Sequence, residues 1–572
     1  MSDGFEVNGS NPSALFTLKI HRGDGMSLLA MNWKNGKPPD NFVGFGIEYK
    51  EPKGNTFFAL KNRLTFPGVD QGDPNAFSTL RSPIQKFRWV HFPRNANLDG
   101  DFTYRVSPLF MNDKDELSVG DPQLAAIELR RETYPNQLNI AYTRGFVSSQ
   151  AFVDRYKTTK GLLPVKANQG LNFVPTHPQA KDALAWMGFE AREAILDVLD
   201  QAVADTGAQV RCVGYDLNNP EVVSRLEKLG PRLKVIIDNS ADHGATGSAE
   251  NEAEKRLVKS AGRANVQRQH MGSLQHNKFI AVDGKVQLAV CGSTNFSWRA
   301  FYVQNNNALV LQGKTVVKAF FDAFDTYSKN SSGVGKTDVA GFGAAASAKW
   351  TNLGLAGIDM KLAFSPHAAG NALLKVVADD IQNSTSSSLF YSLAFLYQTK
   401  GVIKDAIVKV TSNKDLFVYG ISDRKVGGLD LQKPDGNLAA VFPAELSKGL
   451  PEPFKSEPTG GGGIRMHHKF LVIDFDKPTA RVYMGSYNFS TPADLENGEN
   501  LLLIRDRRVA VSYLVEALSM FDHYHFRVAQ KEARAAKKKL ELAKPPRKRS
   551  DKPWWAEYYT DRVKIRDREL FA

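Results

Sequence analysis

One stretch of this chain occurs twice. Residues 276–283 read HNKFIAVD and residues 467–474 read HHKFLVID, so each copy has the pattern H-x-K-x4-D. A second element, G-S-x-N, follows each copy, as GSTN at residues 292–295 and as GSYN at residues 485–488. A single H-x-K pattern has little meaning, because short matches arise by chance. The recurrence of all these positions in the same order indicates one functional element that is present twice.

The spacing inside each copy predicts a strand with two functional side chains at its start. The runs FIAV and FLVI are typical of strands that are buried on both faces. Side chains two residues apart share a face of a strand, so His276 points the same way as Lys278, and His467 the same way as Lys469. An ammonium group beside an imidazole suits a phosphate, because the lysine attracts its oxygens and the histidine can attack or donate a proton. For one copy alone, a buried structural histidine beside a snorkelling lysine would be the better interpretation, and the duplication disfavours it.

The paired motifs resemble the signature of the phospholipase D superfamily. The resemblance implies a phosphodiesterase in which one histidine forms a phosphohistidine, while the other protonates the leaving oxygen and then deprotonates water. The histidine of the first motif is usually the nucleophile in this superfamily, so we expect His276 to attack and His467 to act as acid and base. The predicted catalytic residues are His276, Lys278, Asp283, His467, Lys469, Asp474 and Glu499. The predicted phosphate-binding residues are Ser293, Asn295, Ser486 and Asn488. We expect no cofactor and no metal ligand, because no acidic cluster stands near either motif in the sequence.

The residues that follow the two copies differ from each other. The stretch at 497–500 reads NGEN, and Glu499 resembles the glutamate that orients a histidine in the superfamily. The matching residue of the first copy is Asn306, since both lie eleven positions past the asparagine of their G-S-x-N element. We therefore expect a carboxylate partner for His467 and an amide partner for His276, which would make the two imidazoles unequal in basicity. The swapped assignment of nucleophile and acid stays open.

A constant offset indicates an internal duplication. Three pairs of residues are separated by 191 positions, namely Phe173 and Phe364, Pro175 and Pro366, and His276 and His467. In both halves, predicted strands alternate with predicted helices, which is typical of an α/β layer architecture. We expect two similar phospholipase D-like α/β lobes, residues 146–340 and 341–530, related by a pseudo-twofold axis that brings both motifs to one shared cleft.

Residues 1–145 predict a separate β-domain. Short alternating runs such as residues 16–20 and 102–106 are divided by turn residues, and residues 138–142 are a further predicted strand. Several short strands with regular turns are typical of a β-sandwich of the immunoglobulin or fibronectin type. This region contains no catalytic cluster, so it would bind a substrate or partner, or pack on the catalytic unit.

Residues 531–572 are predicted to form a basic and aromatic tail. Residues 531–549 contain nine basic and two acidic side chains, an excess of seven within a net charge of +13. Such a run either attracts a polyanion, whether nucleic acid or anionic lipid headgroups, or is a solvated helix end. The aromatic residues that follow are expected to pack back on the catalytic lobes rather than stack on bases or lie at a lipid interface; they are Trp554, Trp555, Tyr558 and Tyr559.

Length and composition bound the class of protein. A chain of 572 residues exceeds what one core supports, and Cys212 and Cys291 give neither a disulfide framework nor a zinc spacing. No secretory signal or membrane-spanning run is visible, so a cytoplasmic location is expected, although export without a signal leaves no such pattern. The sequence SGVGKT at residues 332–337 resembles part of a phosphate-binding loop, but it lacks the first glycine and a preceding strand, and it predicts a linker. The glycines at residues 460–463 would form either a loop beside the cleft or a plain connector.

Three functions remain open on the sequence. Two lobes in one chain favour a phospholipase D-type lipid hydrolase, able to transfer to alcohols as well as water, because simple nucleases of the superfamily tend to be short dimers with one motif. The basic charge and the tail favour a nuclease or nucleic-acid phosphodiesterase with the same mechanism. A catalytically inactive binding protein is the third, and the intact motifs argue against it. The expected partners are a phosphodiester substrate and, through the tail, an anionic membrane or nucleic acid, and the active site needs no oligomer.

Overall fold

A computed structural model describes most of the chain. The described residues are 4–129, 133–145, 152, 155–329, 349–367, 372–394, 396, 401–423, 428–441, 466–548 and 550–572. They form two compact units, a β unit made of Met1–Arg131 and Val511–Ala572, and an α/β unit made of Glu132–Ala510. The predicted linker at 332–337 and the glycine run at 460–463 lie outside the described residues.

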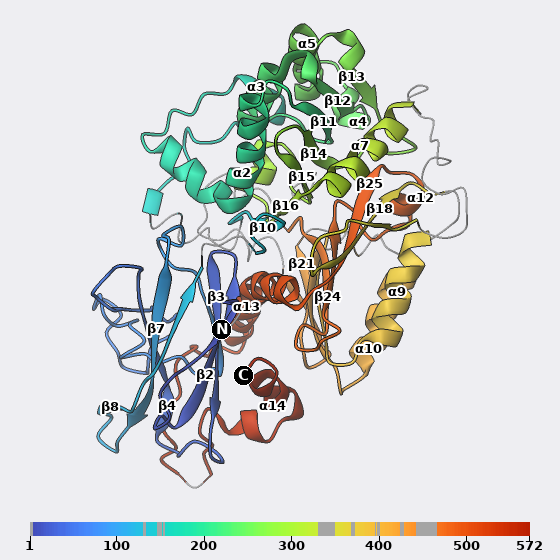
Figure 1. Cartoon of the computed structure of the whole chain (residues 1–572). Coiled ribbons are helices and arrows are strands. Elements are labelled where there is room, and N and C mark those ends of the chain that lie inside the picture. Colours follow the sequence, from blue (N-terminus) through green and yellow to red (C-terminus); the bar gives the residue numbers. More distant parts are fainter. Residues whose placement is uncertain are drawn as a thin grey trace. The chain divides into compact units, whose positions relative to one another are not determined.

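The β unit contains two antiparallel sheets. The first has the order β1 (Glu6–Asn8), β2 (Phe16–Gly23), β3 (Met26–Trp33) and β6 (Arg88–His91). The second has the order β5 (Phe58–Ala59), β4 (Phe42–Lys50), β7 (Asp101–Met111) and β8 (Leu117–Val119), and β9 (Gln123–Glu128) also pairs with β7. The strands of the β unit are the blue arrows of Figure 1. Alternate apolar side chains of β2, β4 and β7 are buried in one hydrophobic core that both sheets share. The alternation of apolar residues that predicted these strands therefore marks the side chains on their buried faces.

The C-terminal segment contributes to this core. It comprises most of α13 (Arg507–Ala535), a 3-10 helix at Ala556–Tyr559 and α14 (Arg562–Glu569). Trp555 and Tyr558 are buried among the core side chains of the β unit, and Nε1 of Trp554 donates a hydrogen bond to the carbonyl oxygen of Phe42 at 3.0 Å. The prediction that these aromatic residues pack against the protein is confirmed. The prediction that they pack on the catalytic lobes is wrong, because an apolar pattern reports burial and not the identity of the partner.

The α/β unit contains two mixed sheets. The first has the order β10 (Leu138–Tyr142), β16 (Asn307–Gln312), β15 (Gln287–Gly292), β14 (Lys278–Asp283), β11 (Gln209–Gly214), β12 (Leu233–Asp238) and β13 (Val266–Gln269). The second has the order β17 (Thr351–Asn352), β18 (Asp359–Ser365), β25 (Glu499–Arg505), β24 (Arg481–Gly485), β23 (Lys469–Ile473), β19 (Ser388–Leu393), β20 (Phe417–Asp423), β21 (Leu429–Gln432) and β22 (Leu438–Val441).

The two sheets share one pattern of pairing. From β10 to β12 in the first sheet and from β18 to β20 in the second, each strand has a counterpart at the same place. The final pair is parallel in both sheets, and the pairs before it are antiparallel. The motif strands β14 and β23 are counterparts in this scheme. Equal order and equal pairing sense are what an internal duplication leaves behind.

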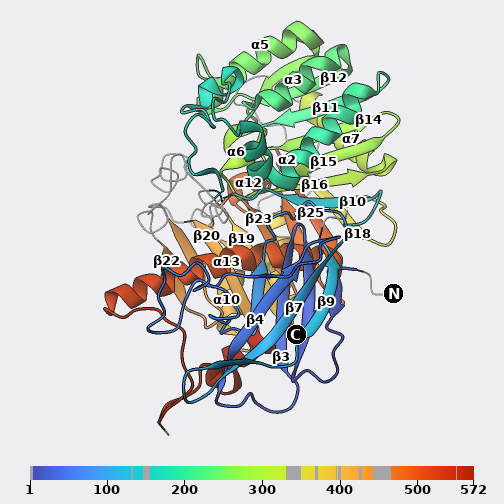
Figure 2. The ribbon, with the colours of Figure 1, turned by 90° about the vertical axis from the view of Figure 1, so that its left-hand side faces the viewer.

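Helices cover these sheets (Figures 1 and 2). The helices with the first sheet are α2 (Ala180–Ala204), α3 (Pro220–Leu229), α4 (Ala241–Gly244), α5 (Ala249–Ala261), α6 (Trp298–Tyr302) and α7 (Lys314–Lys329), with 3-10 turns at Ala167–Asn172, Gly230–Arg232 and Arg263–Asn265. The helices with the second sheet are α9 (Ala372–Ser384), α10 (Val402–Ser412) and α12 (Thr491–Leu495). Phe279 of β14 packs on Phe320 of α7 with 5.1 Å between ring centroids. In the part of the chain that the structure describes, no helix combines the length and the apolar character that crossing a bilayer requires.

Strand β10 differs from its predicted location. Residues 138–142 were expected in the N-terminal β-domain, but β10 pairs antiparallel with β16, with Leu138 opposite Leu311 and Tyr142 opposite Asn307. The prediction of a strand is confirmed, and its assignment to the β-domain is wrong. Alternating apolar residues specify a half-buried strand and leave open which sheet it joins.

Candidate active site

The two motif strands present their charged residues at one end. Strands β14 and β23 each lie between two hydrogen-bonded neighbours in their sheets, and their apolar residues are buried as predicted. His276 and His467 each lie two positions before the first residue of their strand and are 3% and 6% exposed. Lys278 and Lys469 are almost wholly buried as well. Buried charge of this density is costly unless the groups have partners or bind a ligand, which is typical of a functional site.

Each histidine takes its partner from the opposite half of the α/β unit. Nδ1 of His276 lies 2.8 Å from both carboxylate oxygens of Glu499, the first residue of β25. Nδ1 of His467 lies 2.8 Å from Oδ1 of Asn306, which directly precedes β16. We expected the reverse pairing, of Glu499 with His467 and of Asn306 with His276, and that prediction is wrong. Equal spacing along the chain identifies equivalent residues, but in a duplicated site each partner can serve the other copy.

Further contacts of the same kind connect the halves. Nδ2 of Asn500 donates to Oδ1 of Asn277 at 2.9 Å, and the equivalent pair, Nδ2 of Asn307 and Nδ1 of His468, is 3.2 Å apart. The main-chain amide of His467 donates to the carbonyl oxygen of Asn305 at 3.1 Å. These contacts bring both motifs into one site within a single chain.

The site concentrates positive charge. The Lys469 ammonium donates to the carbonyl oxygen of His467 at 2.9 Å, and Lys278 donates in the same way to the carbonyl oxygen of His276. Burial lowers the pKa of Lys469 to about 7. Burial lowers the pKa of Lys278 well below its usual value, and the nearby Lys469 charge contributes to this shift. Two ammonium groups held so close together attract a phosphate. A bound phosphate would in turn raise the pKa values of both lysines, because its negative charge favours their charged forms.

Burial also determines the protonation of the histidines. It lowers the pKa of His276 well below the usual value, and the Lys278 and Lys469 charges lower it further. It lowers the pKa of His467 in the same way, with Lys469, Lys278 and Arg299 as the neighbouring cations. Burial raises the pKa of Glu499 to about 8, against the effect of Lys278. The imidazole of His276 is therefore neutral. Because its Nδ1 faces the carboxyl group of Glu499, its Nε2 is available for reaction.

The predicted phosphate-binding residues fall into two groups. Oγ of Ser293 donates to Oδ1 of Asn306 at 3.0 Å, and a hydrogen bond from Ser486 lowers the pKa of Glu499. The serines therefore hold the partners of the histidines, and their predicted role as direct phosphate ligands stays a prediction. The side chains of Asn295 and Asn488 make no hydrogen bond with any described residue, and Oδ1 of each is buried without a partner. Their amides are free to bind a ligand.

The two motif aspartates do not join the histidines. Asp283 ends β14 and is exposed, and five residues of strand separate it from Lys278 by roughly 17 Å. Asp474 follows β23, and its carboxylate accepts main-chain hydrogen bonds from Ser386, Ser387 and Ser388. The prediction that these two residues are catalytic is therefore wrong, because the length of the motif strand carries them to its far end. They have structural positions.

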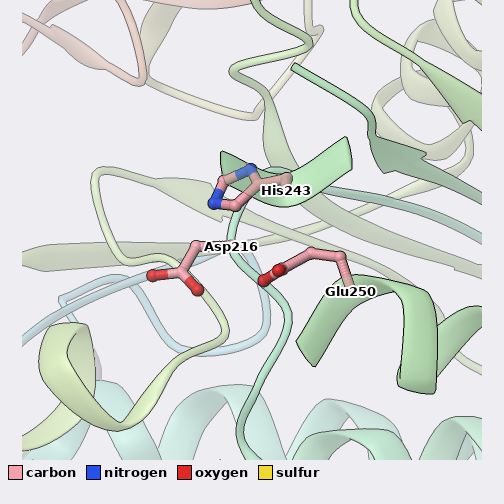
Figure 3. Close-up of side chains that lie close together, drawn as sticks. All are labelled: Asp216, His243 and Glu250. Carbon is pink, nitrogen blue, oxygen red and sulfur yellow. The ribbon is translucent and has the colours of Figure 1, made fainter. Parts of the chain in front are cut away.

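The structure reveals an acidic group near the first motif that the sequence had not shown. Asp216, His243 and Glu250 lie together, with ligand atoms all within 4.8 Å of one another (Figure 3). The ring of Tyr215 lies between this group and the site, 4.5 Å from the ring of His243 and 4.7 Å from that of His276. The expectation that no acidic cluster stands near either motif is wrong. One signal was available, because Asp216 follows the parallel strand β11, and ligands bind at the carboxyl ends of such strands.

Comparisons with known proteins agree with the motifs. A family model described as "Cardiolipin synthase, PLD-like domain" matches residues 191–327 and 377–520. A phospholipase D of Rickettsia prowazekii (strain Madrid E) is 48% identical over 48 residues, which are 8% of this chain and 22% of that protein. The chain thus spans only about a fifth of the length of the curated relatives it matches.

Solved structures match with low scores. Phosphatidylserine synthase of Haemophilus influenzae Rd KW20 is 12% identical with a TM-score of 0.40, covering 61% of this chain and 92% of that one. Nuc of Salmonella typhimurium, a phospholipase D family member, is 24% identical with a TM-score of 0.21, covering 24% of this chain and 88% of that one. Scores of this size do not define a common arrangement of the whole chain.

Proposed function

Because this chain belongs to the phospholipase D superfamily, we propose that it cleaves phosphodiesters through a phosphohistidine on His276. The observation that carries the proposal is the buried pair of His276 and Glu499, set in one site with His467 and two lysines. A neutral imidazole that is fixed through Nδ1 has its other nitrogen available as a nucleophile. Two cations nearby stabilise the charge that develops on the phosphoryl oxygens.

The reaction has two steps. Nε2 of His276 attacks phosphorus, the bond to the leaving oxygen breaks, and His467 gives that oxygen a proton. His467 then takes a proton from water, the water oxygen bonds to phosphorus, and the bond to His276 breaks. The bound anionic phosphate raises the pKa of His467 and thereby favours the protonated form that the first step needs. Lys278 and Lys469 bind the oxygens, with the amides of Asn295 and Asn488 as further donors. The acid–base steps need only side chains of this chain, so we propose hydrolysis that is independent of metal ions.

A phospholipid headgroup ester is the proposed substrate, with an alcohol as an alternative acceptor to water. The description of the matching family model and the rickettsial relatives favour lipid chemistry. Nucleic acid is the second candidate, and the net charge of +13 favours it. The proposed partners are correspondingly an anionic membrane surface or nucleic acid at the basic tail. Both histidines belong to one chain, so no oligomer is needed.

The proposal includes the architecture around the site. We propose that the halves with the two mixed sheets are phospholipase D-like lobes related by a pseudo-twofold axis. The equal strand order and the exchanged partners of His276 and His467 support this view. We propose also that the β unit is a sandwich of the immunoglobulin or fibronectin type, which its two sheets and common core support.

The test compares substrates in the presence of EDTA. Purified protein is incubated with phosphatidylcholine vesicles and, separately, with single- and double-stranded nucleic acid. Release of choline with an unchanged kcat in EDTA supports the proposal, and cleavage of nucleic acid alone selects the second candidate. His276→Ala and His467→Ala should each abolish turnover while thermal melting stays normal. If either variant keeps more than a few per cent of the activity, or if EDTA abolishes kcat at saturating substrate and a divalent ion restores it, the mechanism is wrong.

A further inference from the structure

Three potential metal ligands converge next to the active site. Asp216 follows β11, His243 lies in the short helix α4, and Glu250 lies in the first turn of α5. Figure 3 shows their side chains directed toward a common point. The imidazole nitrogen and one oxygen of each carboxylate all lie within 4.8 Å of one another. Ligands of one ion with bonds of about 2.0–2.2 Å lie roughly 3–4.4 Å apart, so small side-chain rotations suffice to close the site.

The orientation of His243 is that of a metal ligand. Its Nδ1 lies 2.8 Å from Oδ2 of Asp238. Asp238 is itself fully buried, and its Oδ1 accepts the main-chain amide of Gln275 at 2.7 Å. A carboxylate behind one ring nitrogen fixes the tautomer and leaves the other nitrogen as a lone-pair donor, which is the usual support of a metal-bound histidine.

Glu250 supplies independent evidence for a ligand. It is only 3% exposed, and one oxygen accepts the main-chain amide of Leu217 at 3.1 Å. Among the described residues, no other residue donates a hydrogen bond to its second oxygen. Asp216 is in a similar position, since within the same described ranges only its Oδ1 has a partner, Nδ2 of Asn218 at 2.9 Å. Glu250 is buried and Asp216 is half-buried, and neighbouring carboxylates that each keep one oxygen without a donor from another residue favour a bound cation.

We propose that Asp216, His243 and Glu250 bind one divalent cation. One imidazole and two carboxylates, without a thiolate, suit Zn2+ or Mn2+, whereas Ca2+ and Mg2+ prefer oxygen ligands alone. Water would complete the coordination. The site is separate from the reaction proposed above, and nothing in that reaction passes through the ion.

The position of this site defines what the ion would do. Tyr215 directly precedes Asp216, and its ring contacts the ring of His276 and lies 4.9 Å from Nζ of Lys278. Asp238, which supports His243, also holds the main chain at Gln275, immediately before His276. An ion bound here therefore stiffens two supports of the first motif at once. Its role is to position the site, and its loss should change substrate affinity more than turnover.

Direct metal binding tests the proposal. Tag-free protein is stripped with a chelator, dialysed, and titrated with Zn2+ or Mn2+ by calorimetry, with Ca2+ and Mg2+ for comparison. We expect one Zn2+ or Mn2+ per chain and weaker binding of the other two ions. Glu250→Gln and Asp216→Asn should each weaken binding at least tenfold, and Asp238→Asn by about 10- to 100-fold, as for other supports of metal ligands. The matched controls Asp242→Asn and Glu252→Gln remove carboxylates from the same segment that are not ligands, and they should bind like the native chain.

Two outcomes would overturn the inference. One is a native chain that binds neither Zn2+ nor Mn2+ stoichiometrically, which would make the group an internal network of histidine and carboxylates. The other is binding that Glu250→Gln and Asp216→Asn leave unchanged. Thermal melting with and without the ion gives a second measurement, since only a folded site is stabilised by its ligand. The His276→Ala variant should bind the ion normally, so that failure of the proposed reaction and failure of this site are distinguishable.

Discussion

Replacing Glu499 by glutamine removes the carboxyl group behind His276 and little else. The two side chains have nearly the same volume, and the amide can keep the contacts with Ser486 and Asn497 that surround the carboxylate. What changes is the acceptor at 2.8 Å from Nδ1 of His276. The introduced amide can accept from Nδ1 through its oxygen or donate to it through its nitrogen. The second orientation places the imidazole proton on Nε2, where it blocks attack.

The expected fall in kcat follows from two losses, that of the carboxyl acceptor at Nδ1 of His276 and that of the reactive imidazole tautomer. Glu499 is ionised above about pH 8, and a hydrogen bond to a charged group is worth about 1.5–3 kcal/mol, which corresponds to roughly 10- to 150-fold in rate. A wrong tautomer adds to this, since the equivalent carboxylate-to-amide change behind a catalytic histidine lowers turnover about 10⁴-fold in serine proteases. We therefore expect Glu499→Gln to lower kcat by about 10²- to 10⁴-fold.

The matched change in the other half is Asn306→Asp. It gives His467 a carboxylate and raises its pKa, because a negative neighbour favours the imidazolium. The acid form then persists to higher pH, so the alkaline limb of the rate profile should move upward while kcat at its optimum changes by less than about tenfold. Hydrolysis of bis(p-nitrophenyl) phosphate measures both variants without a choice between lipid and nucleic acid. If Glu499→Gln turns over within about threefold of the native chain, the carboxylate does not support the nucleophile.

Three further predictions concern charge and stability. Lys469 has a pKa of about 7 in the folded chain and 10.5 in the unfolded chain, so its buried charge destabilises the fold most below pH 7 and ceases to do so as the pH rises toward 10.5. Lys469→Met should therefore abolish activity yet raise the melting temperature. The gain in the free energy of unfolding should be up to about 5 kcal/mol at pH 6 and much less at pH 10. Asp474→Ala leaves three main-chain amides without an acceptor and should lower the free energy of unfolding by about 3–5 kcal/mol, measured by thermal melting. The matched change at the exposed Asp283, Asp283→Ala, should lower it by less than about 0.5 kcal/mol. Equal effects of the two changes would contradict the structural role of Asp474. Gln substitutions in the basic tail should raise KM for anionic vesicles or nucleic acid at low salt and leave kcat unchanged, and unchanged affinity would make the tail a solubility feature. The substituted residues are Lys537, Lys538, Lys539, Lys548 and Arg549, while Arg547 is kept because it pairs with Asp113 and Asp115.

Local signals in the sequence predict the elements well. Helix α3 occupies residues 220–229 because Asn219 caps its first amides, Pro220 fits the first turn and Gly230 ends it. The motif strands follow equally from their apolar runs.

The same signals do not predict which distant residues meet in the folded chain. Glu499 and Asn306 are equivalent by spacing, and only the folded chain determines that each faces the histidine of the other half. Asp216 and Glu250 are 34 residues apart and are joined only because β11 and β12 lie side by side. Strand β10 shows the same limit, since its pattern does not identify β16 as its partner.

The central claim is that His276 forms the covalent intermediate, and one trapping experiment tests it. The His467→Ala variant is mixed with bis(p-nitrophenyl) phosphate, whose leaving group needs no proton from an acid, and is then quenched in alkali, in which phosphohistidine survives. Because the second step lacks its base, we predict a burst of one nitrophenolate per chain and a nitrophenyl phosphoryl group on the peptide that contains His276. An adduct on another residue, or steady release of nitrophenolate without any adduct, would contradict the account.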